Sequence, residues 1–201
     1  MNKLLFILSV VFIGFFAGLL TYQLSNYSLA EQDLEGHIAE KIHQSMNAEA
    51  AIQVEEIKDV GNYRNVLFTI LNPVPSDSET QMGLAVFKKG WIGIKYQFVG
   101  AGWGTNPIDA YLLHASASTD NKADQYLVVY GRNPSTSQAF ERFSIQLQDE
   151  LLSRELSDRP YFVEIFPVTV DGDKNVVSSI RFDREGDDSE SYPLIITSRI
   201  R

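Results

Sequence analysis

The fold class follows from one stretch of the sequence, MGLAVFKKGWIGIKYQFV at residues 82–99. Residues 82–88 form an apolar run of strand length, and Lys89-Gly90 is a turn signal. In 92–99, large apolar residues alternate with glycine and polar residues, as in a strand with one buried face. The side chains expected on that face are Ile92, Ile94, Tyr96 and Phe98.

The same two-residue periodicity continues along the chain from residue 52 to the C-terminus. Short apolar runs are separated by turn-forming Gly, Asn, Asp and Pro, and about nine strands are predicted. There is no alternation of strands with long helices, so a parallel sheet is disfavoured. We predict a mainly β, α+β fold built on an antiparallel sheet, sandwich or open barrel. We also expect a Gly-rich corner at 100–107, a short helix at 149–157 and loops at 72–81 and 183–191.

The N-terminus carries one long apolar run. Residues 4–20, LLFILSVVFIGFFAGLL, contain no charge, and as a helix they span ~26 Å. Thr21 and Tyr22 extend that span toward the ~30 Å hydrocarbon thickness of a bilayer. Lys3 precedes the run and the next basic residue is Lys41, so we expect the N-terminus in the cytoplasm and the rest of the chain outside. The prediction is a single-pass anchor in the cell membrane.

A cleaved signal peptide is the alternative for this segment. Ser28-Leu29-Ala30 is an acceptable small-x-small cleavage site. The apolar run is longer than the ~7–15 residues usual in signal peptides, and the gap from Leu20 to Ala30 is long for a cleavage region. We therefore favour the uncleaved anchor and leave cleavage after Ala30 open.

Residues 29–50 have the pattern of an amphipathic helix, because an apolar residue recurs at every fourth position: Leu34, Ile38, Ile42 and Met46. A coiled-coil seam would also need apolar residues near Lys41 and Ser45. We therefore expect this stripe to pack on the β domain. The chain divides into an anchor (1–28), an amphipathic helix and an extracytoplasmic β-rich domain (51–201).

Composition excludes several function classes. The net charge of −9, with no basic stripe, makes nucleic acid an unsuitable partner. The chain has no cysteine, which excludes disulfides, thiolate metal sites and a cysteine nucleophile. Its three histidines form no H-E-x-x-H or H-x-H motif, and His114 is expected at the edge of the core. We expect no catalytic residue, no metal site and no cofactor.

Two loops resemble ligand-binding motifs only superficially. Residues 100–104 read G-x-G-x-G but lead into a strand, whereas a dinucleotide loop leads into a helix. Residues 171–175, DGDKN, resemble the start of a calcium loop, but Val176 and Phe182 stand where an EF-hand has Gly and Glu. A tight corner and a β-turn, respectively, account for these segments.

The most unusual local composition is aromatic and glycine together. Trp91 and Trp103 are expected beside Gly-rich turns, outside the alternating strand pattern. Exposed aromatic side chains on a rigid sheet can stack on sugars or anchor a peptide. With Arg132 and Asn133 of a nearby loop, they form the candidate binding surface, and the candidate partners are an envelope protein or a cell-wall glycan. The alternative is that both tryptophans cover the ends of the core.

Three segments resemble parts of single-pass envelope proteins of Bacillus-type Gram-positive bacteria: AVFKKGWxGxKY at 85–96, GTN at 104–106 and YGRNP at 130–134. The resemblance implies only an address, a cell membrane with the domain outside. It brings no activity, ligand or site residue.

Three functions remain open at this stage. The first is a membrane-anchored domain for binding or protein interaction, without chemistry of its own. The second is an envelope hydrolase that uses an acidic pair, with candidates Glu141, Glu150, Glu155 and Glu164. The third is an accessory subunit or sensor whose membrane helix packs on a partner helix through Gly14 and Gly18.

Overall fold

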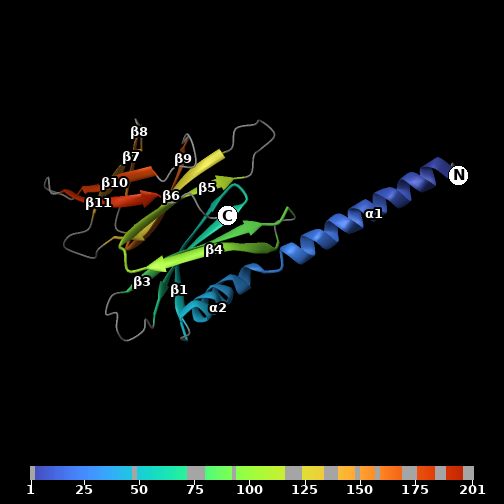
Figure 1. Ribbon diagram of the computed structural model, residues 1–201, viewed down its shortest axis with the longest axis horizontal. Helices are drawn as coiled ribbons and strands as arrows, with labels where there is room; N and C mark the ends of the chain where they lie inside the picture. Colours follow the sequence, from blue (N-terminus) through green and yellow to red (C-terminus); the bar gives the residue numbers. More distant parts are fainter. Residues whose placement is uncertain are drawn as a thin grey trace.

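The computed structural model describes residues 3–46, 49–71, 80–91, 94–115, 124–133, 140–147, 150–156, 159–168, 176–183 and 189–196. These form two α-helices, one 3₁₀ turn and eleven strands (Figure 1). Their bounds are α1 Lys3–Asn26, η1 Glu31–Asp33, α2 Leu34–Met46, β1 Ile52–Val60, β2 Tyr63–Ile70, β3 Gln81–Lys89, β4 Tyr96–Gly104, β5 Ile108–Ala115, β6 Asp124–Arg132, β7 Arg142–Leu147, β8 Glu150–Glu155, β9 Tyr161–Val168, β10 Val176–Asp183 and β11 Ser189–Ile196.

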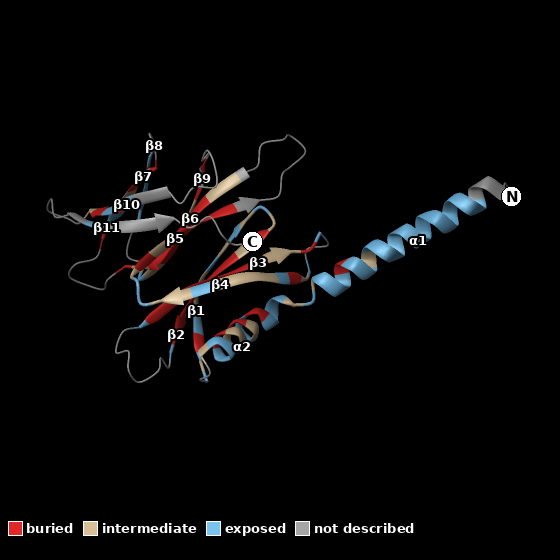
Figure 2. Cartoon of the chain, viewed as in Figure 1, coloured by how far each residue is buried: buried red, intermediate tan, exposed pale blue. Residues whose placement is uncertain are grey.

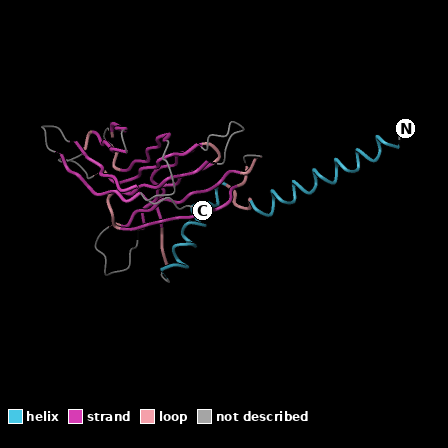
Figure 3. The backbone as a smooth tube through the Cα atoms, turned by 45° about the horizontal axis from the view of Figure 1, so that its top comes forward, coloured by secondary structure: helices cyan, strands magenta, loops and turns pink. Residues whose placement is uncertain are grey.

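The strands form three antiparallel sheets, which confirms the predicted mainly β class. One sheet has the order β1-β2-β3-β4, the second β5-β6-β9 and the third β11-β10-β7-β8. The sheets lie on one another in layers, with α2 on the outer face of the first (Figure 3). The middle sheet is buried on both faces, and Leu127, Val128 and Val129 of β6 have no exposed surface. A continuous apolar run is what such a strand requires.

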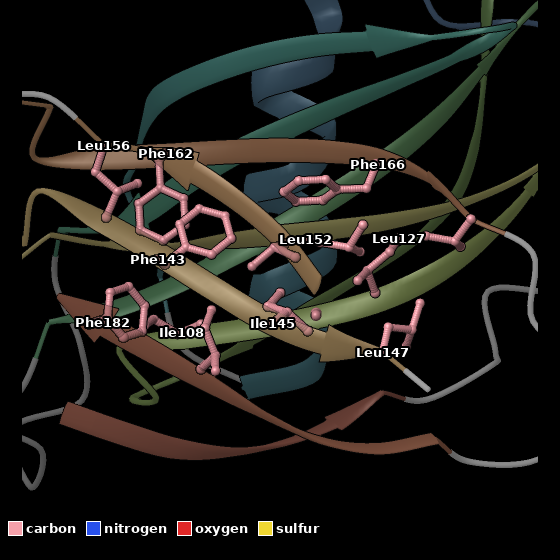
Figure 4. Packing of buried hydrophobic residues seen from close by; sticks show 14 of the residues in the cluster. Ile108, Leu127, Phe143, Ile145, Leu147, Leu152, Leu156, Phe162, Phe166 and Phe182 are labelled. Atoms are coloured by element: carbon pink, nitrogen blue, oxygen red, sulfur yellow. The ribbon is translucent and has the colours of Figure 1, made fainter. Parts of the chain in front are cut away.

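The largest apolar cluster fills the space between the second and third sheets (Figure 4). The ring of Phe143 lies at its centre, with centroids 5.5 Å from Phe162 and 6.0 Å from both Phe166 and Phe182. Rings at such separations add dispersion and quadrupole energy to the burial of their area. This cluster joins strands far apart in the sequence, so the third sheet depends on the second for its stability.

The amphipathic stripe of α2 packs as predicted on the β domain. Leu34, Ile38 and Ile42 are buried against the first sheet, and Met46 is partly buried there. The helix begins later than expected. Leu29 instead forms a β-bridge with Tyr96, its N–H donating to the Tyr96 carbonyl at 3.1 Å and its carbonyl accepting from the Tyr96 N–H at 2.8 Å.

Several local predictions were wrong. The segment expected as a helix at 149–157 is strand β8, since its pairing with β7 buries Leu152 and leaves Leu151 exposed. Periodicity within six residues does not distinguish the two structures. The expected corner at 100–107 is largely strand, because β4 runs to Gly104. Ile94, expected in the core, is 68% exposed.

Other predictions fall partly or wholly outside the described residues. The loop at 72–81 ends earlier than expected, because Gln81 belongs to β3. Likewise, the expected loop at 183–191 overlaps β10 at Asp183 and β11 from Ser189. The side chains of Ile92 and His114 and the segment 171–175 lie outside the described residues.

Helix α1 leaves the domain at one end and extends away from it (Figure 2). Its segment Phe6–Asn26 is long and apolar enough to cross a membrane. Large apolar side chains are exposed along it, for example Phe12 at 68%. A water-soluble protein rarely exposes so large an apolar surface.

Candidate functional site

The four residues of the candidate binding surface do not form one patch. Trp91 follows β3 and is 62% exposed, whereas Trp103 lies near the far end of β4 and is half-buried. Tyr96 and Trp103, seven residues apart on β4, are separated by ~24 Å along the strand. Arg132 and Asn133 lie at the end of β6, in the second sheet.

Asn133 has a structural role in the described fold. Its side-chain Nδ2 donates to the Phe140 carbonyl at 3.0 Å, and its Oδ1 accepts from the Phe140 N–H at 2.9 Å. The residue is only 4% exposed. These two bonds link the end of β6 to the backbone of Phe140. An amide bonded in this way at a buried position has no free face for a ligand.

Trp103 was expected in a turn, and that prediction was wrong. It lies within β4 opposite Gly83 of β3 and is partly buried against the cluster beneath α2. A Cβ on residue 83 would lie 2.7 Å from the Trp103 Cβ and 2.5 Å from Cζ of Phe68. Glycine at 83 therefore makes room for the tryptophan, and the sequence pattern did not reveal this because the two residues are twenty positions apart.

A network of charged groups joins β1 to the neighbouring strand β9. The Glu164 carboxylate accepts from Lys58 Nζ at 3.1 Å and from Arg159 Nη2 at 2.8 Å. Arg159 also approaches Glu56, at 3.4 Å. The structure thus brings two carboxylates to one guanidinium, as it does at Arg64 with Glu31 and Asp59, and in both places the acids are neutralised by a shared cation.

The same network satisfies the outward backbone groups of Val163 in β9. The Glu56 carboxylate accepts the backbone N–H of Val163 at 2.9 Å, and the Lys58 ammonium donates to the Val163 carbonyl at 2.7 Å. Two side chains of β1 therefore replace the strand that would otherwise pair there. Pro167, four residues on and in the same phase, has no N–H to offer. Glu56 therefore bonds the backbone of β9, and Glu164 is held by Lys58 and Arg159.

The other acids named as hydrolase candidates do not converge. Glu141, Glu150 and Glu155 are exposed, and Glu155 lies 3.4 Å from Arg142 in a surface ion pair. Glu56 was missed by sequence reasoning, since an acid in a two-residue alternation carries no signal of its partner 107 positions away. Among the described residues, no group of three or more His, Asp or Glu could hold a metal ion.

The Asp109 carboxyl group has a raised proton affinity. Burial raises the pKa of Asp109 above its ordinary value, opposed by hydrogen bonds from the Ala110 N–H at 2.8 Å and the Tyr130 hydroxyl at 3.3 Å. Burial and the nearby Asp109 together raise the pKa of Tyr130. The two groups lie at the middle sheet beside apolar residues, which indicates a buried polar contact.

The free edge of β4 contrasts with that of β9. Its sequence, YQFVGAGWG, contains no charge and no proline, the usual protections of an exposed edge. Tyr96 is paired with Leu29, and beyond that bridge no strand in the described part of the chain pairs with this side of β4. From the register with β3, the backbone groups of Ala101 and Trp103 point outward.

A bulge interrupts β4 between its paired start and this free segment, where the register with β3 shifts between Val86 and Phe87. Gly102 and Gly104 follow the bulge. A Cβ at either position would meet no heavy atom within 4 Å, so space is open on that face of the strand. The edge from Ala101 to Gly104, which we call the β4 edge, is the candidate functional site.

The chain matches no family model, no curated protein and no solved structure.

Proposed function

We propose that this protein is a single-pass membrane protein whose β domain lies on the outer side and binds an extended peptide segment by strand addition at the β4 edge. It is a non-catalytic interaction domain in this proposal. The partner is an envelope protein that presents an extended segment, and the address agrees with the resemblance to envelope proteins of Bacillus-type bacteria.

The membrane part of the proposal rests on α1. Its 24 residues span ~36 Å, sufficient for a ~30 Å hydrocarbon core. The positive-inside rule favours a cytoplasmic N-terminus, since Lys3 precedes the apolar segment and acidic residues follow it. The alternative remains a signal peptide cleaved after Ala30.

The binding part rests on one observation, the Leu29–Tyr96 bridge. It is a one-residue strand addition that the chain itself makes to β4, with both backbone bonds formed. A partner peptide that lay beside β4 on the same side as Leu29, but beyond the bulge, would satisfy the outward backbone groups of Ala101 and Trp103. Backbone bonds of this kind supply affinity in strand addition, and side chains at alternate positions supply selectivity.

The shape of the β4 edge indicates what the peptide needs. On one face, a partner side chain would lie beside the half-buried Trp103. On the other, it would lie over Gly102 and Gly104, where large apolar or aromatic side chains can cover the exposed strand. A cell-wall glycan fits less well, because sugar stacking needs an exposed ring face and the two tryptophans lie at opposite ends of the β3–β4 region.

A matched pair of lysine variants tests the binding site. Gly102→Lys adds a charge to the β4 edge at a position with open space, and Gln97→Lys adds the same charge to an exposed position before the bulge. Peptides selected from a display library against the full chain in nanodiscs should bind the Gly102→Lys variant more than ~10-fold more weakly, a loss of ~1.4 kcal/mol. Binding to Gln97→Lys should stay close to that of the wild type.

Hydrogen exchange gives the second measurement. A selected peptide should slow exchange of the Ala101 and Trp103 amides, which face outward in the free protein. Selected peptides that protect no β4 amide, or that bind both lysine variants equally well, would refute strand addition at this edge.

A further inference from the structure

Gly90, which follows β3, lies against the end of α1. Gln23 in the last turns of the helix is only 6% exposed, although Tyr22 and Leu24 beside it are 65% and 61% exposed. Gln23 is covered by Gly90, where an added Cβ would lie 1.9 Å from the Gln23 Nε2. The helix end and Gly90 are thus in direct contact.

Further bonds hold this arrangement. Lys95 Nζ donates to the Ser28 carbonyl at 3.2 Å, beside the Leu29–Tyr96 bridge. Arg64 of β2 pairs with Glu31 just after the helix. These bonds involve Ser28, Leu29 and Glu31, so the domain is joined to α1 through packed and bonded residues, and its position relative to the membrane follows from the helix.

The depth of the β3–β4 connection can be estimated from the length of the helix. A helix crosses a ~30 Å hydrocarbon core in ~20 residues. With Lys3 at the inner surface, α1 reaches the outer boundary near Tyr22 and Leu24. Gly90 contacts the helix at this level, so the residues around it lie in the layer of lipid headgroups.

The side chains at this level have the composition of a membrane-interface segment. Trp91 and Ile94 are 62% and 68% exposed, and among the described residues of the domain they are two of the few large apolar side chains that face solvent. Tryptophan is enriched at the boundary between hydrocarbon and headgroups, where its ring is apolar and its N–H reaches polar groups.

Lysine side chains flank the two apolar residues in a chain of net charge −9. Lys88 lies over the Tyr63 ring at 5.9 Å and Lys95 bonds a carbonyl, so neither makes an ion pair within the described residues. Lys89 is paired with Asp59. The ammonium groups of Lys88 and Lys95 are suited to lipid phosphates, which attract basic side chains close to the surface.

We propose that the outer leaflet of the membrane is the ligand of this surface: Trp91 and Ile94 insert at the acyl boundary while Lys88 and Lys95 contact lipid phosphates. We call these four residues the lipid-contact surface. The inference rests on the membrane anchor of the proposed function and is independent of the peptide site. The lipid contact holds the domain in a fixed orientation, with β4 running away from the membrane.

The two tryptophans of the chain provide the test. In full-length protein reconstituted in phosphatidylcholine–phosphatidylglycerol vesicles, the Trp103→Phe variant reports Trp91 alone, and the Trp91→Phe variant reports Trp103 alone. Lipids brominated near the top of the acyl chain should quench Trp91 strongly and shift its emission to the blue relative to the protein in lipid-free detergent. They should leave Trp103 nearly unquenched, because it lies ~24 Å beyond Tyr96 along the strand.

Resistance to alkaline carbonate extraction separates the two proposals. If the chain stays in the membrane and Trp91 is not quenched, the lipid-contact surface is refuted while the anchor stands. Equal quenching of both tryptophans also refutes it, because the domain would then lie flat on the membrane. If carbonate releases the chain, the anchor fails and the lipid contact fails with it. Replacing Lys88 and Lys95 by serine should reduce the quenching of Trp91 in anionic vesicles.

Discussion

Gly83 is the position at which the packing of the first sheet can be tested most sharply. In Gly83→Ala, the new Cβ would lie 2.5 Å from Phe68 Cζ, 2.6 Å from the Gly102 carbonyl oxygen and 2.7 Å from the Trp103 Cβ. Two of these neighbours cannot rotate away, since one is backbone and the other is the first atom of a side chain. The strands β3 and β4 must therefore separate locally.

Overpacking of this kind costs ~1–3 kcal/mol in free energy of unfolding. For a chain of this size, 1 kcal/mol corresponds to ~2–4 °C in Tm, so Gly83→Ala should lower Tm by roughly 2–12 °C. Gly102→Ala is the matched control, because a Cβ there meets nothing within 4 Å. It should leave Tm unchanged or raise it slightly, since glycine is entropically costly in a strand.

Differential scanning fluorimetry or calorimetry on the full chain in detergent measures both variants. The reasoning is refuted if Gly83→Ala melts within ~1 °C of the wild type, or if Gly102→Ala lowers Tm as much as Gly83→Ala does. The first result would mean that β3 and β4 are farther apart than described. The second would mean that the face of β4 at Gly102 is covered.

Two further predictions concern His37 and Glu56. Burial, and then the charge of Lys41, lower the pKa of His37 below its ordinary value of 6.5, so the unfolded chain binds the proton more tightly than the folded chain does. The contribution of His37 to the free energy of unfolding should therefore be complete above about pH 6.5 and should be lost as the pH falls below it. Denaturant titrations at about pH 7.5 and 5.5 should show this loss in the wild type and a smaller loss in His37→Phe. Glu56→Ala leaves the Val163 N–H at the β9 edge without its acceptor, so the free energy of unfolding should fall by ~1–3 kcal/mol and hydrogen exchange of that amide should accelerate. An unchanged exchange rate would show that another group accepts the Val163 N–H.

Sequence periodicity was sufficient for those features that depend on neighbouring residues. The apolar length of residues 4–20 predicts a helix long enough to span a membrane, and the four-residue spacing of Leu34, Ile38 and Ile42 predicts the buried face of α2. The mainly β class also follows, because alternation along a strand is local. Burial of one face is encoded within each element, whichever partner covers it.

Tertiary structure alone decided which strands share a sheet and which edges stay open. Glu56 bonds the Val163 N–H at the edge of β9 although the two residues are 107 positions apart, and Gly83 makes room for Trp103 from a neighbouring strand. Likewise, the contact of Gly90 with Gln23 brings Trp91 to the end of α1. Such pairings depend on register and on layer packing between distant segments, and a short strand carries no record of its neighbour in its own hydrophobic pattern.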